Sequence, residues 1–270
     1  MKLWCLLLTC GCLWGQTLVP QAECLQVDKL AAADKQIALD ILADALESEA
    51  LYTLATPDKP VSVGFRYVFG PEGSPETEAQ LTSWRRAVAG LRCGSDLEWW
   101  VAPMGPAYRG KRFVHVWVAR RSGVRRVMSE NLDFFGNLQI DQTIGTPRLL
   151  ATVDQAGSEV AFRGLGLLLG HPAAAVEYGE QQRKWQKTGL RMPQGSMAIP
   201  TAGARPFAWS WAQPIGAVAT ERVKALETRA KGVLEEYKKR KAEFIGEGKP
   251  GPAALLLAWW CTEKGCRLPD

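Results

Sequence analysis

The stretch Lys111–Arg120, KRFVHVWVAR, decides the fold. Val114, Val116 and Val118 alternate with Phe, His, Trp and Ala, so both faces of this segment are largely apolar. Strands that are apolar on both faces are typical of the centre of a sheet covered on both sides. The stretch therefore predicts a central, doubly covered strand.

Other segments supply neighbours for this strand. Residues 61–69 and 97–102 have the β-branched and aromatic content of strands. Arg121–Val124 resembles a tight turn, and it predicts a second hairpin strand ending near Glu130. Short strands are also expected at 138–140 and 148–153. Together these segments predict a mainly antiparallel sheet built from residues 61–153.

Helices are expected at both ends of the chain. Apolar residues recur at helical spacing over 28–55 and again over 220–244. Ser74 followed by Pro75 marks the start of a further helix, and 158–169 and 172–189 form a helical corner. We therefore expect an α+β fold, with helices from both ends covering the sheet. Residues 24–270 are expected to form a single domain, whose one plausible seam is the Gly/Pro-rich segment 189–216.

The N-terminal segment has the features of a signal peptide. Lys2 precedes the uncharged run Leu3–Trp14, whose 12 residues are too few to span a bilayer as a helix. We expect a signal peptide over 1–23, cleaved between residues 15 and 24. The protein would then be exported to the periplasm or the cell exterior. No later run is long and apolar enough to predict a transmembrane segment in the mature chain.

Cysteine usage agrees with export. Of the seven cysteines, Cys24, Cys93, Cys261 and Cys266 follow the signal segment. Exported chains meet oxidising conditions, so two disulfides are expected. Because Cys261 and Cys266 can close a small loop relaxed by Gly265, we predict the pairs Cys261–Cys266 and Cys24–Cys93.

No catalytic motif stands out. The chain contains two histidines and lacks the usual metal-binding and nucleotide-binding patterns, so neither a metal nor a cofactor is expected. His115 is expected to play a structural part within its strand. A carboxylate-dependent hydrolase remains an alternative, since it needs only two carboxylates or a carboxylate and a histidine across a bond. Its candidate residues are Glu130, Asp133, Asp141, Asp154, His171 and Glu177.

Two features suggest binding. Trp209 and Trp211 share a strand face, where indole rings suit sugar rings. Four arginines surround the expected Ser122–Gly123 turn, where guanidinium groups could hold phosphate or carboxylate. These arginines are Arg120, Arg121, Arg125 and Arg126. The formal net charge of +5 is too modest to indicate nucleic-acid binding by an exported chain.

These observations favour a non-catalytic exported protein that binds an envelope polymer, either a glycan or an anionic polymer, or a protein partner. The first alternative is the extracytoplasmic hydrolase. The second is a structural or assembly protein acting through the 220–244 helix, whose apolar stripe could pack on a partner helix.

Overall fold

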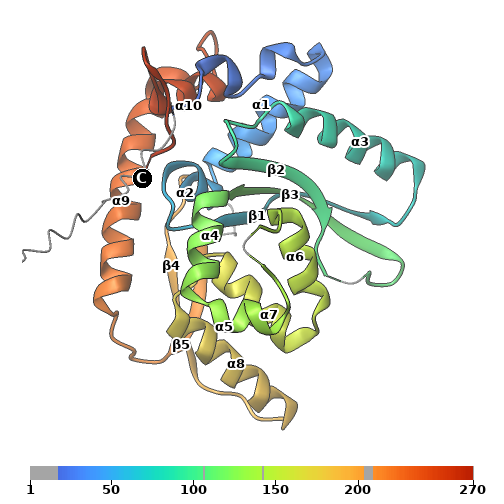
Figure 1. The fold of residues 1–270 in the computed structure, drawn as a ribbon, viewed down its shortest axis with the longest axis vertical. Helices are drawn as coiled ribbons and strands as arrows, with labels where there is room; N and C mark the ends of the chain where they lie inside the picture. The colour runs from blue at the N-terminus through green and yellow to red at the C-terminus, as the bar shows by residue number, and fades with distance from the viewer. Residues whose placement is uncertain (1–17, 106, 142, 204–208, 270) are drawn as a thin grey trace, which may run out of the picture.

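A computed structural model describes residues 18–105, 107–141, 143–203 and 209–269 of the chain (Figure 1). The signal-peptide prediction therefore lies mostly outside the described residues, as do Cys5, Cys10 and Cys12. Within the described residues, no helix is both long and apolar enough to cross a membrane. The fold is α+β, as predicted from the sequence.

The main sheet has three strands in the order β1-β3-β2, and both pairings are antiparallel. They are β1 (Val61–Pro71), β2 (Leu97–Pro103) and β3 (Lys111–Arg120). The prediction that β3 is the central strand is confirmed. An irregularity between Val63 and Tyr67 shifts the β1–β3 register.

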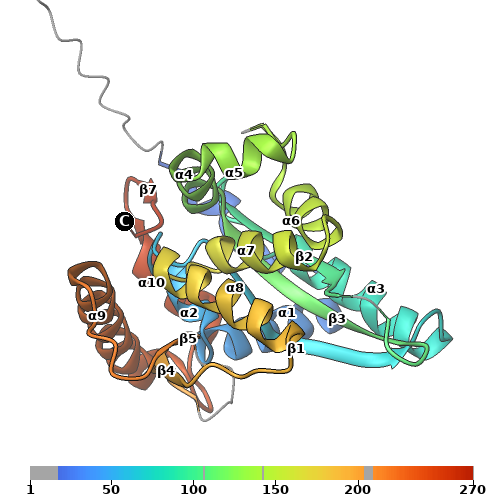
Figure 2. The same ribbon diagram turned by 90° about the horizontal axis from the view of Figure 1, so that it is seen from below.

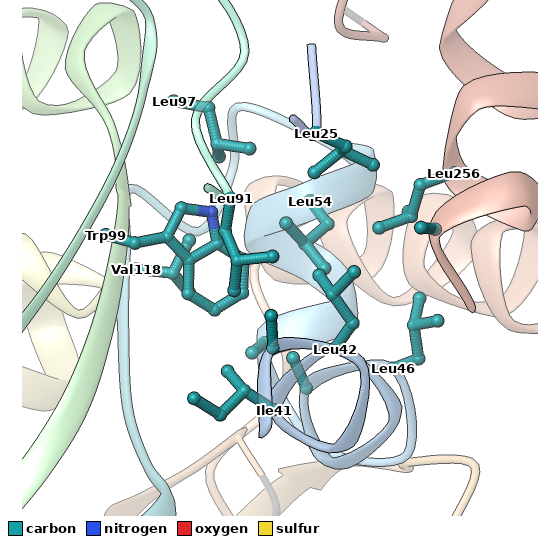
Figure 3. Packing of buried hydrophobic residues seen from close by; sticks show 14 of the residues in the cluster. Leu25, Ile41, Leu42, Leu46, Leu54, Leu91, Leu97, Trp99, Val118 and Leu256 are labelled. Carbon is teal, nitrogen blue, oxygen red and sulfur yellow. The ribbon is translucent and has the colours of Figure 1, made fainter. Parts of the chain in front are cut away.

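Helices from both ends of the chain, together with one helix from between β1 and β2, cover one face of the sheet. They are α1 (Ala32–Leu46), α2 (Ala50–Ala55), α3 (Pro75–Ala89) and α10 (Pro252–Trp260). Figure 3 shows how their leucines, with Leu42 and Leu256 among them, surround a core to which the sheet contributes Trp99 and Val118. Ser74 caps α3 by accepting a hydrogen bond from the Thr77 N–H, as its sequence predicted.

The middle of the chain covers the opposite face with a second set of helices (Figure 2). The set comprises α4 (Arg121–Glu130), α5 (Leu132–Asn137), α6 (Thr146–Gln155), α7 (Ser158–Leu168) and α8 (Ala173–Lys187). Its core contains Trp117 and Ala119 of β3 together with Leu149 and Leu168. The even and odd residues of β3 thus enter two different cores.

A third core joins a hairpin to the long C-terminal helix. The hairpin consists of β4 (Gln194–Ile199) and β5 (Trp209–Pro214), and α9 runs from Glu221 to Phe244. Trp209 and Trp211 pack here against Val223 and Leu226 of α9. The hairpin lies within the predicted seam, of which residues 204–208 are outside the described part.

The predicted hairpin after β3 is wrong, because residues 121–130 form helix α4. Val124, Val127 and Met128 are buried at helical spacing, and Asp96 accepts hydrogen bonds from the Ser122 N–H and hydroxyl at 2.7 and 2.9 Å. Gly123 is needed for a close approach, since a Cβ there would lie 3.1 Å from the Pro57 carbonyl oxygen. Gly123 therefore allows α4 to pack closely on the loop containing Pro57, and it does not form a turn.

Three further secondary-structure predictions need correction. Residues 148–153 lie in α6, where Pro147 occupies the first turn. Residues 138–140 form no strand, since 138 and 139 lie in a turn. The predicted helix over 28–55 is interrupted between α1 and α2. Consequently the sheet ends at Arg120 and does not extend to residue 153.

Both predicted disulfides are present. Cys24 pairs with Cys93, and Cys261 pairs with Cys266 between the short strands β6 (Cys261–Thr262) and β7 (Gly265–Cys266). Beside the second bridge, Val19 exchanges two backbone hydrogen bonds with Cys266, at 2.9 and 2.7 Å. The first and last described segments are therefore held together.

A buried ion pair lies at the junction of the cores. Lys59 is fully buried, and its Nζ lies 3.3 Å from Glu49 Oε2 and donates to the Leu169 carbonyl at 3.1 Å. The same ammonium lies 5.0 Å from the centre of the Trp209 ring. Burial raises the pKa of Glu49 and lowers that of Lys59, while each charge opposes the shift of the other.

Replacing Lys59 alone should be strongly destabilising, because Glu49 would be left buried without its counter-charge. For Lys59→Ala we expect the free energy of unfolding in urea to fall by about 3–5 kcal/mol. The double variant Lys59→Met/Glu49→Leu is the control, since it removes both charges and keeps most of the volume. Its loss should be much smaller, and equal losses in the two proteins would contradict this account of the pair.

Candidate functional site

An exposed row of aromatic side chains lies on the outer half of the main sheet. It consists of Tyr67 and Phe69 on β1 and Phe113 and His115 on β3, and we call it the aromatic row. The pairs Tyr67–His115 and Phe69–Phe113 are directly opposite each other across the two strands. All four side chains therefore belong to one face of the sheet.

The rings of the row contact one another. The ring centroids of Phe69 and Phe113 lie 4.3 Å apart in a stacked arrangement, and those of Tyr67 and His115 lie 5.5 Å apart. Tyr67 also contacts Phe113 at 5.7 Å. The row is thus a preformed surface whose side chains support each other's orientation.

The covering helices end before they reach this row. Trp117 on the same face is 4% exposed, whereas Phe113 is 41%, Phe69 40% and Tyr67 45% exposed. In Figure 2 the outer end of β1 extends beyond α6, α7 and α8. The prediction that β3 is covered on both sides therefore holds only for its second half. Contiguous exposed apolar patches are a feature of binding surfaces, which makes the aromatic row a candidate site.

Basic groups lie at the outer end of the row. Lys111 places its Nζ 5.7 Å from the Phe69 ring centre, and Arg109 places its guanidinium 5.2 Å from the ring of Tyr108, which is 62% exposed. The backbones of Tyr108 and Lys111 are hydrogen-bonded to each other. This end of the sheet thus offers aromatic surface and positive charge together.

His115 adds an uncharged ring at the inner end of the row. Burial lowers its pKa to about 4, so the imidazole is neutral at pH 7. Its ring lies 6.0 Å from Phe113 and 6.5 Å from Trp117. His115 therefore extends the aromatic surface from the exposed rings into the core.

The tryptophans predicted to bind sugar are not available for it. Trp209 is 1% and Trp211 6% exposed, because α9 and Tyr52 pack over the hairpin. Their alternation on a strand was predicted correctly, but the face they share points into the molecule. The aromatic chemistry expected from the sequence is exposed on a different pair of strands.

The predicted arginine cluster is also dispersed. Arg120 is 1% exposed and donates to the Pro269 carbonyl, while Arg121 lies 3.3 Å from Glu98. Arg125 is exposed on α4, and Arg126 lines a cleft beside α9. Arg120 ends β3, and the helical repeat of α4 points the other three side chains in different directions.

The predicted catalytic residues are only partly brought together. Glu130 and His171 line the same cleft as Arg126, and Asp133 borders a neighbouring hollow that Glu130 also reaches. Asp141 accepts hydrogen bonds from Thr143 in its own turn.

The last two candidates, Asp154 on α6 and Glu177 on α8, line neither of these depressions. In the described part of the chain, no group of three His, Cys, Asp or Glu side chains could hold a metal ion.

Comparisons with protein-family models, with curated proteins and with solved structures found no match to this chain.

The sequence did contain a signal for the aromatic row. Tyr67 and Phe69 alternate on one strand as Phe113 and His115 do on the next, so an antiparallel pairing brings them onto one face. The sequence does not show where the covering helices end, so it does not show that these side chains are exposed.

The neutral state of His115 predicts a loss of stability in acid. Its pKa is near 6.5 in the unfolded chain and about 4 in the folded protein, so between these values the unfolded chain binds more protons. Stability should therefore fall as pH decreases from 6.5 to 4. We expect His115→Gln to abolish about 2 kcal/mol of that fall.

Urea unfolding at pH 7 and pH 4.5 measures this effect. His171, whose pKa is lowered to about 3 mainly by burial, contributes to the acid loss in the same direction, so His171→Gln is the companion variant. If the loss of stability between pH 7 and pH 4.5 is the same in His115→Gln as in the wild type, the His115 imidazole is not desolvated in the folded protein.

Proposed function

We propose that this is a non-catalytic, exported protein that binds an anionic polysaccharide of the cell envelope through the aromatic row. The observation behind this proposal is that Tyr67, Phe69 and Phe113 are exposed side by side on the paired strands β1 and β3. Flat aromatic faces pack against the C–H faces of sugar rings. Lys111 and Arg109 then supply positive charge for acidic substituents.

The compartment is part of the same proposal. An apolar leader and two disulfides are compatible with export, and the pairing of Val19 with Cys266 favours a cleavage site before Leu18. Cleavage nearer to Cys24 would remove a residue that bonds to β7. A mature N-terminus at or before Leu18 lies within the range expected from the sequence.

The alternative functions receive less support. Among the residues lining the Glu130 cleft, both carboxylates are paired with arginines, and His171 is neutral near pH 7 because its pKa is about 3. A glycosidase needs one carboxyl group to donate a proton and a second to act as base or nucleophile, and both carboxylates here are engaged by arginines. The apolar stripe of α9, which an assembly role would use, is buried against its own chain.

Removing the two phenylalanines should weaken polysaccharide binding. For Phe69→Ala/Phe113→Ala we expect the dissociation constant for a uronate-containing polysaccharide to rise about tenfold or more, from lost stacking and burial. Affinity electrophoresis or titration calorimetry on the folded protein measures the change. Higher ionic strength should weaken binding further through Lys111 and Arg109.

Trp185→Ala is the matched control, because Trp185 is a 46% exposed aromatic residue on α8 and is not part of the row. It should leave the dissociation constant unchanged. If the wild-type protein shows no saturable binding at low salt, or if Trp185→Ala weakens binding as much as the double variant, the proposal is refuted.

A further inference from the structure

A separate charged cleft lies between α4, the start of α8 and the first turns of α9. Its volume is about 460 Å³. Three arginines and two carboxylates line it, together with His171 and apolar side chains of α4 and α9. The charged residues are Asp58, Arg126, Glu130, Arg222 and Arg229. These charged residues come from segments that are far apart in the chain and lie close together in the folded protein.

One arginine of the cleft is fully engaged. Arg229 donates to both carboxylate oxygens of Asp58, at 2.6 and 3.0 Å. This two-point contact matches the planar guanidinium to a planar carboxylate and fixes Arg229 in one orientation. Arg229 therefore forms a wall of the cleft and anchors α9 to the loop before β1.

The other two arginines share one carboxylate loosely. Arg222 Nη2 lies 3.5 Å from Glu130 Oε2, and Arg126 Nε lies 3.9 Å from Glu130 Oε1. The first distance is at the upper limit of a hydrogen bond and the second exceeds it. Arg126 is held in place from its other side, where Nη2 donates to the Pro57 carbonyl at 2.7 Å. Two guanidinium groups thus face a single negative charge at distances longer than optimal.

We propose that this cleft binds a carboxylate group of a ligand between Arg126 and Arg222, beside Glu130. The site is separate from the aromatic row, and its occupancy does not depend on polysaccharide binding there.

The charge balance identifies the class of anion. Three arginines and two carboxylates leave one uncompensated positive charge in the cleft. A single carboxylate neutralises it, whereas a doubly charged phosphate would add repulsion against Glu130. Glu130 itself occupies the position between these two guanidinium groups at 3.5 and 3.9 Å, so a ligand carboxylate would compete with it for their N–H donors.

The rest of the lining indicates the body of the ligand. Val127 of α4 and Val223 and Leu226 of α9 give the cleft an apolar side, and His171 adds a ring that is neutral near pH 7. A compact organic acid therefore suits the cleft better than an inorganic ion.

Acetate is the first probe. It is titrated into the folded, isotope-labelled protein, and NMR records the chemical shifts of the arginine Nε–Hε signals. The signals of Arg126 and Arg222 should shift saturably, while that of Arg163, which pairs with Glu180 outside the cleft, should not. Inorganic phosphate at equal ionic strength is the comparison probe. Stronger binding of phosphate than of acetate at these arginines would overturn the carboxylate assignment.

Two variants separate binding from structure. The Arg222 side chain is 76% exposed, so Arg222→Ala should fold normally while its acetate dissociation constant rises about tenfold. Glu130→Gln removes the internal competitor and should instead bind acetate about fivefold more tightly. A merely structural ion pair would not produce this gain. Weaker or unchanged binding in Glu130→Gln would refute the site, and so would a lack of saturable shifts in the wild type.

Discussion

The burial of Lys59 is the constraint on which the arrangement of the cores depends. A buried ammonium must find partners for its charge and its N–H groups, and here they come from Glu49 before α2 and from Leu169 after α7. Trp209 of the hairpin covers the same group. One ammonium group thus contacts three segments that are distant in sequence, at Glu49, Leu169 and Trp209. Glu49 lies in the interruption between α1 and α2, which places it beside Lys59.

Local rules predicted much of the fold. The alternation of β3, the cap at Ser74 and the two disulfides all follow from short-range pattern or simple pairing arguments. The failures came where tertiary contacts override local pattern. Arg121–Glu130 became a helix because Asp96, which is distant in sequence, caps its start, and a single sequence does not show that contact.

The candidate surfaces illustrate the same limit. The sequence predicted aromatic rings and arginines as binding groups, but the predicted tryptophans are buried, and of the four predicted arginines Arg126 lines the cleft. Trp209 is buried by a helix that follows it in the chain, and Phe113 is exposed because the helices over its sheet stop short. Burial depends on where covering elements end, and periodicity within one strand says nothing about that position.

The hydrogen bonds between Val19 and Cys266 determine how the molecule would sit on a support. Because they hold the two ends of the described chain together, a linker attached at either end would leave from the same side. Figures 1 and 2 both place that side opposite the outer end of β1. Tethered by either end, the protein would point its exposed sheet outward, away from whatever surface carries it.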